Sequence, residues 1–175
     1  MDKKVVFLDR DGVINEEVSY LHKIEDFKFI NGIFSSLKAL QDLGYYFIVV
    51  TNQSGIGRGI YTNEDYKIID QWMKKEFKKN GIRILYSIHC PHTQEENCEC
   101  RKPKPGMLEK CLKLFQISKD DSWMVGDSER DIEAAIKAGI TNNILVRSGH
   151  PISEESTNAS AVIDSIKDIT KIIKS

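Results

Sequence analysis

The chain has 175 residues, of which 41% are hydrophobic and 29% charged, and its formal net charge is −1 at pH 7, with a pI of about 6.4. This composition is typical of a globular protein with its own core, and it excludes a global basic field that would attract nucleic acid or an anionic membrane. No apolar run approaches the ~20 residues of a membrane span, and the N-terminal stretch MDKKVVFLDR has too short an apolar segment for a signal peptide. We therefore expect a cytoplasmic monomer, with residues 1–175 forming one domain and with no nucleic-acid or membrane partner.

Short β-branched or apolar runs alternate with helical patterns along the chain. The first predicted strand covers residues 4–8, and a helix with an apolar stripe from Ile33 to Leu43 follows it and ends at Gly44. After a second strand at 45–50, Thr62 is placed to cap a long helix that ends at the sequence NG. The remaining predicted strands cover residues 84–89, 122–125 and 143–146, and the remaining predicted helices follow Pro105, surround residues 132–138 and cover residues 166–173.

This alternation predicts an α/β fold, a Rossmann-like three-layer sandwich with a mostly parallel sheet. Asp9, Thr51 and Asp127 each stand at the carboxyl end of a predicted strand. Because the carboxyl ends of parallel strands share one edge, where ligands bind, we expect these three side chains to converge.

Carboxylates gathered at one edge repel one another unless a cation lies between them. Asp9, Asp11 and Asp127 offer the oxygen ligands that Mg²⁺ prefers, and phosphate oxygens of a substrate can complete its octahedral shell. We expect Asp9 and Asp127 to bind the ion through their side chains, and Asp11 through its backbone carbonyl. A carboxylate beside a metal can attack phosphorus, while the Thr51 hydroxyl and the Lys102 ammonium can balance the charge of the transferred group. Taken singly, these motifs also fit a turn, a strand end and a helix cap.

Residues 90–100, with the sequence CPHTQEENCEC, contain four metal-ligand types: Cys90, His92, Cys98 and Cys100. Three thiolates and one imidazole form the closed tetrahedral set typical of structural Zn²⁺. The residues between them are polar, and ordering them costs roughly 1–2 kcal/mol each in backbone entropy, whereas zinc binding contributes about 10–16 kcal/mol in small sites. We therefore expect a small zinc-binding loop that directs Arg101 and Lys102 towards the phosphate site. Free cysteines with an ordinary loop histidine are the alternative.

Four segments resemble, in order, the motifs of the haloacid dehalogenase superfamily of phosphatases: FLDRDG, VVTNQSG, CRKPKPGM and MVGDSERD. The resemblance covers nearly the whole chain. It implies that Asp9 is the nucleophile, which forms an aspartyl-phosphate, and that Asp11 is the general acid and then the base that activates water. It also implies that Thr51 and Lys102 hold the phosphoryl group and that Asp127 completes a magnesium site.

Many members of this superfamily carry a cap domain inserted after the first or the second motif. Neither of these gaps has room for a separate domain here, so we expect no cap domain. The site should be open and roofed only by the flap VINEEVSYLHKIEDFKF and the zinc loop.

The zinc loop resembles that of two groups in the superfamily, the D-glycero-D-manno-heptose 1,7-bisphosphate 7-phosphatases and the histidinol-phosphate phosphatases. The segments TNQSGIGRG, YLHKIEDFKFI and RSGHPI are similar to the heptose group, whereas the five-residue gap in the zinc loop also occurs in the histidinol group. The first resemblance implies a function in nucleotide-heptose and surface polysaccharide synthesis, and the second implies one in histidine synthesis. A non-catalytic, zinc-stabilised interaction module and a phosphoacceptor domain are alternatives from other classes.

The resemblance also implies contacts between the phosphorylated sugar and residues of the flap, the second motif and the zinc loop. These expected contacts are Glu17, Val18, Ser19, Tyr20, Asn52, Gln53, Ser54 and Arg101. The chain departs from the heptose pattern at Ser128, where a lysine is common. We expect Arg101 or Arg130 to replace that phosphate contact.

Overall fold

A computed structural model describes residues 1–175, and its centre is a six-stranded sheet in the order β3-β2-β1-β4-β5-β6. All neighbouring strands pair in parallel. The strands are β1 (Val5–Leu8), β2 (Tyr46–Asn52), β3 (Ile84–Cys90), β4 (Trp123–Gly126), β5 (Asn142–Val146) and β6 (Ala161–Ile163). This is the strand order of a doubly wound Rossmann-like fold, so the expected α/β class is confirmed.

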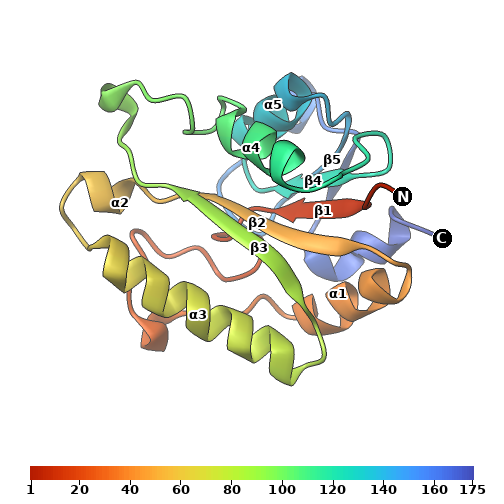
Figure 1. Ribbon diagram of the computed structural model, residues 1–175, viewed down its shortest axis with the longest axis horizontal. Coiled ribbons are helices and arrows are strands. Elements are labelled where there is room, and N and C mark those ends of the chain that lie inside the picture. Colours follow the sequence, from red (N-terminus) through yellow and green to blue (C-terminus); the bar gives the residue numbers. More distant parts are fainter.

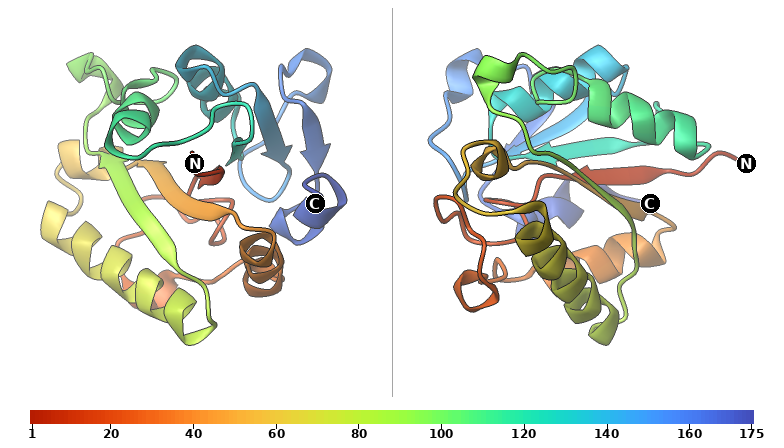
Figure 2. Two further views of the ribbon diagram at one scale, coloured as in Figure 1. Left: turned by 45° about the vertical axis from the view of Figure 1, so that its right-hand side comes forward. Right: turned by 60° about the vertical axis from the view of Figure 1, so that its left-hand side comes forward.

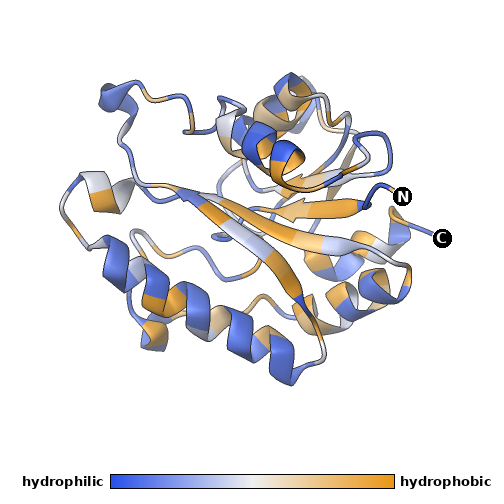
Figure 3. Cartoon of the chain, viewed as in Figure 1, coloured by the Kyte–Doolittle hydropathy of each residue, from blue (hydrophilic) through white to orange (hydrophobic).

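Helices cover both faces of the sheet, which gives the three layers visible in Figures 1 and 2. One layer contains α1 (Ile33–Asp42), α3 (Asn63–Lys79) and a short 3-10 helix, Ile166–Lys171. The other layer contains α4 (Gly106–Leu114) and α5 (Glu129–Ala138). Figure 3 shows apolar strands between helices that carry hydrophilic residues on their outer faces.

The continuous apolar run of β1 is explained by its position at the centre of the sheet. Val6 and Leu8 pack into the core beneath α1 and α3, whereas Val5 and Phe7 pack into the core beneath α4 and α5. All four side chains are fully buried. A parallel strand covered on both faces is apolar at every position, and it carries Asp9, the next residue, to a fixed place at the sheet edge.

The helix boundaries follow the expected capping residues. The Thr62 hydroxyl accepts the backbone N–H of Asp65 at 3.1 Å, and the Asp65 carboxylate accepts the N–H of Thr62 at 2.9 Å, which completes a capping box at the start of α3. Gly139 ends α5 in the left-handed conformation, with φ of 91°.

The C-terminal part differs from the expected α-helix over residues 166–173 and also contains a strand that was not expected. Residues Ala161–Ile163 form β6 at the edge of the sheet, and the expected helix over 166–173 is a 3-10 helix that ends at Lys171. Three residues are too few to show an alternating pattern in the sequence, so β6 could not be recognised. The apolar stripe itself was correctly placed, since Ile166, Ile169 and Ile173 are buried. A four-residue helix, α2 (Ser54–Gly57), was also not expected.

The flap and the loop after β3, which lie above the sheet edge, contain little regular secondary structure. Between β1 and α1 the chain forms the flap, with one 3-10 turn at Ile24–Asp26, and the loop after β3 has one at Gln94–Glu96. Neither segment is a separate folded unit, in agreement with the expected absence of a cap domain. None of the helices combines the length and the apolar character needed to cross a membrane.

Candidate active site

The carboxyl ends of β1, β2 and β4 meet at one edge, as expected, beneath a cavity of about 320 Å³. The cavity is lined by residues from the flap, the end of β2 and the segment after it, Arg101 and Lys102 just after the Cys/His loop, the segment after β4, and His150. They include all the expected substrate contacts, namely Glu17, Val18, Ser19, Tyr20, Asn52, Gln53, Ser54 and Arg101, and also Asp9, Asp11, Lys102 and Asp127. Thr51 lies behind this wall, is 1% exposed and does not line the cavity.

Lys102 lies between two buried carboxylates at the floor of the cavity. Its Nζ atom is 3.0 Å from Asp9 Oδ1 and 2.6 Å from Asp131 Oδ1, and it also donates to the carbonyl of Val50 at 2.7 Å. Burial alone lowers the pKa of Lys102, but the pairs with Asp131 and Asp9 outweigh it, and the net shift is upward. The ammonium is therefore held charged beside the Asp9 carboxylate.

Asp9, Asp127 and Asp131 form a buried acidic cluster in which one ligand oxygen from each residue lies within 4.8 Å of the others. Burial raises the pKa of Asp9 to about 7, and Asp127 adds to this shift, although Lys102 opposes it. Burial likewise raises the pKa of Asp131 to about 6, and the Asp9 charge adds to it. Three carboxylates against one ammonium leave excess negative charge in a buried place, so the donor set fits a hard divalent cation.

The Asp11 carboxylate is turned away from this cluster and is held by three side chains. Arg10, which is 1% exposed, donates from Nη2 to Asp11 Oδ1 at 3.0 Å and to Oδ2 at 3.3 Å. Asn15 Nδ2 donates to Oδ1 at 3.0 Å, and Gln53 Nε2 donates to Oδ2 at 3.1 Å. The carboxylate lines the cavity in a fixed orientation, where it can exchange a proton with a bound group.

Gln53 joins Asp11 to the end of β2. Its Nε2 atom also donates to the Thr51 hydroxyl at 2.9 Å, and its Oε1 atom accepts from the Tyr61 hydroxyl. Gln53 is 3% exposed. Its side chain thus links the Thr51 hydroxyl to the Asp11 carboxylate.

Asn52 fixes the backbone at Lys102 with two hydrogen bonds. The Asn52 Nδ2 atom donates to the Lys102 carbonyl at 3.1 Å, and the Lys102 N–H donates to Asn52 Oδ1 at 3.0 Å. The Asn52 amide therefore pairs with both backbone polar groups of Lys102, as a peptide group of a neighbouring strand would, and joins β2 to residue 102.

The Cys/His cluster is formed by the last residue of β3 and by the loop that follows β3; Figure 1 shows the course of that loop. The ligand atoms of Cys90, His92, Cys98 and Cys100 all lie within 4.8 Å of one another. The Arg101 N–H donates to Cys98 Sγ at 3.3 Å, and Arg101 Nη1 donates to the His92 carbonyl at 3.4 Å. The four donors can hold a metal ion, and the same loop holds Arg101 at the cavity wall. His89 is not one of these donors; its Nε2 atom lies within hydrogen-bond distance of Asn63 Oδ1, at 2.9 Å.

Sequence reasoning missed the contribution of residues 147–150, which approach Asp127 from β5. His150 donates to Asp127 Oδ2 from its backbone N–H at 3.0 Å and from Nδ1 at 2.7 Å. The hydrogen bond to Asp127 raises the pKa of His150. His150, Arg58 and Tyr61 all line the cavity. The segment RSGHPI resembles the heptose group, but nothing in it indicates a contact with Asp127, so only the fold reveals these contacts.

Residues 8–144 match the family model of the haloacid dehalogenase-like hydrolases. The chain is 44% identical, over 98% of its length and 97% of the relative, to D-glycero-alpha-D-manno-heptose-1,7-bisphosphate 7-phosphatase of Photorhabdus laumondii. It is 45% identical, over 97% of its length and 95% of the relative, to D-glycero-beta-D-manno-heptose-1,7-bisphosphate 7-phosphatase of Vibrio cholerae.

A solved structure of a heptose bisphosphate phosphatase also matches the chain. The D,D-heptose 1,7-bisphosphate phosphatase from B. bronchiseptica, complexed with magnesium and phosphate, superposes with a TM-score of 0.84 and 26% identity, and the match covers 96% of each chain. The four motifs, the parallel sheet and the acidic edge of the present chain agree with these matches. The chain therefore belongs to the haloacid dehalogenase-like hydrolases.

Proposed function

We propose that the chain is a metal-dependent phosphatase that removes the 7-phosphate of D-glycero-D-manno-heptose 1,7-bisphosphate. The observation that carries this proposal is the buried Asp9, Lys102 and Asp127 arrangement at the floor of a polar cavity. Relatives that share 44–45% identity over nearly the whole chain bear the name of this activity. Their number and coverage support the heptose bisphosphate over histidinol phosphate as the substrate.

In the proposed reaction, Asp9 attacks the phosphorus atom and forms an aspartyl-phosphate as the bond to the sugar oxygen breaks. Asp11 gives its proton to the leaving sugar oxygen, and then takes a proton from the water that hydrolyses the aspartyl-phosphate. Arg10, Asn15 and Gln53 hold Asp11 towards the cavity for both steps. Lys102 balances the charge of the phosphoryl group as it moves.

The acidic cluster would hold Mg²⁺ through the side chains of Asp9 and Asp127 and the backbone carbonyl of Asp11. The ion, when bound, neutralises phosphate charge and lowers the repulsion between the substrate and the carboxylates. Asp131 supports this arrangement from behind by pairing with Lys102 at 2.6 Å. Thr51, which is buried behind Gln53, would contribute by orienting that side chain, and its own contact with phosphate remains a prediction.

The Cys/His cluster would hold Zn²⁺ as a structural ion, because its four donors leave no open position for a substrate. The bound ion would fix the loop that carries Arg101. The substrate would lie under the flap, in contact with Glu17 to Tyr20, and its sugar would face Asn52 to Ser54. Arg101 and Arg130 supply positive charge at the same cavity for the phosphate that is not cleaved.

The test is phosphate release from purified protein with Mg²⁺. Both anomers of the heptose bisphosphate, histidinol phosphate and a general aryl phosphate would be compared at equal concentrations. We expect kcat/KM to be highest for one heptose anomer. Release from histidinol phosphate alone would establish the alternative enzyme, and no release from any ester would exclude a phosphatase. Accumulation of a stable aspartyl-phosphate would instead indicate a phosphoacceptor domain.

A further inference from the structure

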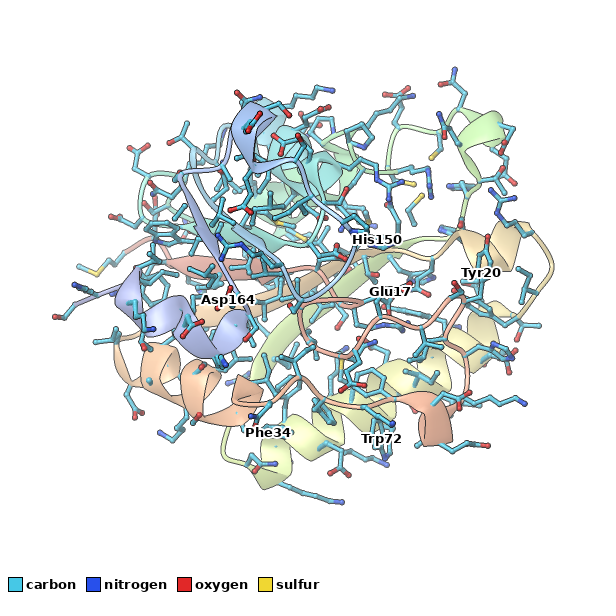
Figure 4. The ribbon with its side chains drawn as sticks, turned by 180° about the vertical axis from the view of Figure 1, so that it is seen from behind. Glu17, Tyr20, Phe34, Trp72, His150 and Asp164 are labelled. Atoms are coloured by element: carbon cyan, nitrogen blue, oxygen red, sulfur yellow. The ribbon has the colours of Figure 1, made fainter.

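We propose that His150 is a positioning residue with two separate tasks: its Nδ1 atom orients Asp127 for a divalent cation, and its Nε2 atom anchors the flap at Glu17. The inference rests on the proposed metal-dependent reaction at this site. It adds a residue that lies outside the four motifs, in the loop after β5. Figure 4 shows His150 and Glu17 near each other, at the side of the molecule where the flap passes the 147–150 loop.

The contacts on Asp127 leave one of its oxygens for a cation. Both hydrogen bonds that Asp127 accepts fall on Oδ2, one from the backbone N–H of His150 at 3.0 Å and one from its Nδ1 at 2.7 Å. Oδ1 accepts none. Because a carboxylate oxygen accepts, Nδ1 of His150 must carry the proton. Two donors from one residue thus fix the rotation of the carboxylate and leave Oδ1 without a protein donor.

The close approach of this loop is built into the backbone. A Cβ atom at Gly149 would lie 2.1 Å from Asp127 Oδ2, and one at Gly12 would lie 2.3 Å from the same oxygen. The loop is held on this side by Ser148, whose hydroxyl donates to the carbonyl of Gly12 at 2.7 Å. The backbone of residues 148–150 is therefore packed directly against Asp127, and this close approach requires glycine at positions 12 and 149.

The other ring nitrogen faces the flap. His150 Nε2 lies 4.0 Å from Glu17 Oε1, at the limit of an ion-pair contact and beyond hydrogen-bond distance, and the His150 side chain, which lines the cavity, is 48% exposed. Glu17 and its neighbours Val18 to Tyr20 line the same cavity. Because the ring hydrogen-bonds the proposed ligand Asp127 and lies within ion-pair distance of Glu17, it couples two parts of the site that are far apart in the sequence.

Two substitutions of His150 separate these tasks, because each one keeps a hydrogen-bond donor near only one of the two ring nitrogens. His150→Asn places an amide nitrogen near the position of Nδ1, and His150→Gln places one near that of Nε2. Mg²⁺ binding to the protein without substrate is measured by titration calorimetry, and KM and kcat are measured at saturating Mg²⁺. His22→Asn, which removes an imidazole that does not line the cavity, is the matched control for Mg²⁺ binding.

We expect His150→Gln to weaken Mg²⁺ binding roughly 10–100-fold, the usual effect of losing a partner of a metal ligand, and His150→Asn to bind Mg²⁺ almost normally. In the kinetic assay, His150→Asn should raise KM with little change in kcat. Equal Mg²⁺ affinity in all variants would overturn the inference, and so would equal losses in both variants together with a lower unfolding temperature. Mg²⁺ binding that depends on Nδ1 in a protein that releases no phosphate would support the role of His150 and refute the proposed function.

Discussion

The floor of the cavity and the loop of residues 90–100 lie side by side but are held in place by different forces. Asp9, Lys102 and Asp127 are almost fully buried, at 8%, 3% and 1% exposed, and they follow strands or join them through hydrogen bonds. The loop exposes Gln94 to Asn97 to solvent and buries Cys90 alone. Packing positions the floor, whereas the loop converges on its four clustered Cys and His side chains, which would hold a metal ion.

The boundary between the two regions runs between Arg101 and Lys102. Lys102 is held by Asn52, Val50, Asp9 and Asp131, none of which belongs to the loop. Arg101 depends on the loop through its bonds to Cys98 and His92. An ion bound by the four donors would therefore control Arg101, which is expected to bind the substrate, more directly than Lys102, which is expected to stabilise the transferred phosphate.

The largest expected effect comes from the floor. Asp9→Asn should reduce kcat by roughly 10⁴-fold or more, because the amide cannot form the aspartyl-phosphate. The same change removes a charge that burial and Asp127 disfavour, but it also takes from Lys102 one of its two carboxylate partners, so the unfolding temperature should change little. Steady-state kinetics and thermal unfolding followed by circular dichroism measure the two quantities. Substantial turnover in this variant would show that Asp9 is not the nucleophile.

Removal of the floor's only ammonium should be nearly as severe. Lys102→Met should lower kcat by roughly 10²–10³-fold, the usual loss for one group that stabilises the transition state. It should also cost about 3–5 kcal/mol in unfolding free energy, because two buried carboxylates lose their partner. Lys113→Met, on the exposed side of α4, is the control and should change neither quantity. An unchanged urea midpoint for Lys102→Met would contradict the buried ion pairs.

Removal of zinc should disturb the loop and spare the floor. Protein treated with a chelator and then given Mg²⁺ should show a KM increased roughly 10–100-fold, the effect of losing one hydrogen bond to a charged group, with a much smaller change in kcat. Hydrogen exchange in residues 91–100 should become fast. Cys98→Ser should give the same result, and Cys111→Ser, a buried residue of α4 outside the cluster, should not. A collapse of kcat with unchanged KM would show that zinc positions Lys102 after all.

The smallest expected effect comes from the start of α3, and it tests whether the stability of this helix affects the cavity floor or the loop of residues 90–100. Thr62→Ala removes the capping box of α3 and should lower the unfolding free energy by about 1 kcal/mol. Neither KM nor kcat should change, because Thr62 does not line the cavity. Chemical unfolding and kinetics on the same preparation make the comparison. A change in activity would indicate that α3 is coupled to the site through Tyr61, which immediately precedes the cap.

The sequence predicted the floor better than its surroundings, for physical reasons. β1, β2 and β4 are apolar on both faces, and such runs are visible without any long-range information, so Asp9 and Asp127 could be placed at one edge. The Cys/His cluster could be predicted in the same way, because its four residues lie within eleven positions of one another in the sequence. β6 depends on pairing with β5, and the contact of His150 with Asp127 depends on the approach of a polar loop. The local sequence shows neither of these long-range contacts, although RSGHPI resembles the heptose group. The burial of Thr51 behind Gln53 also depends on a side-chain contact that no periodicity encodes.

The two glycines that face Asp127 limit how this chain can change. Because a methyl group at Gly12 or at Gly149 would overlap the same carboxylate oxygen, neither position can be diversified without displacing that acid. A library aimed at new substrates should therefore keep both glycines and vary Val18, Ser19 and Tyr20 of the flap, whose side chains line the cavity and do not contact Asp127 or His150. Substrate specificity can therefore be changed on the flap side of the cavity, whereas the glycines that pack against Asp127 on the other side have to be kept.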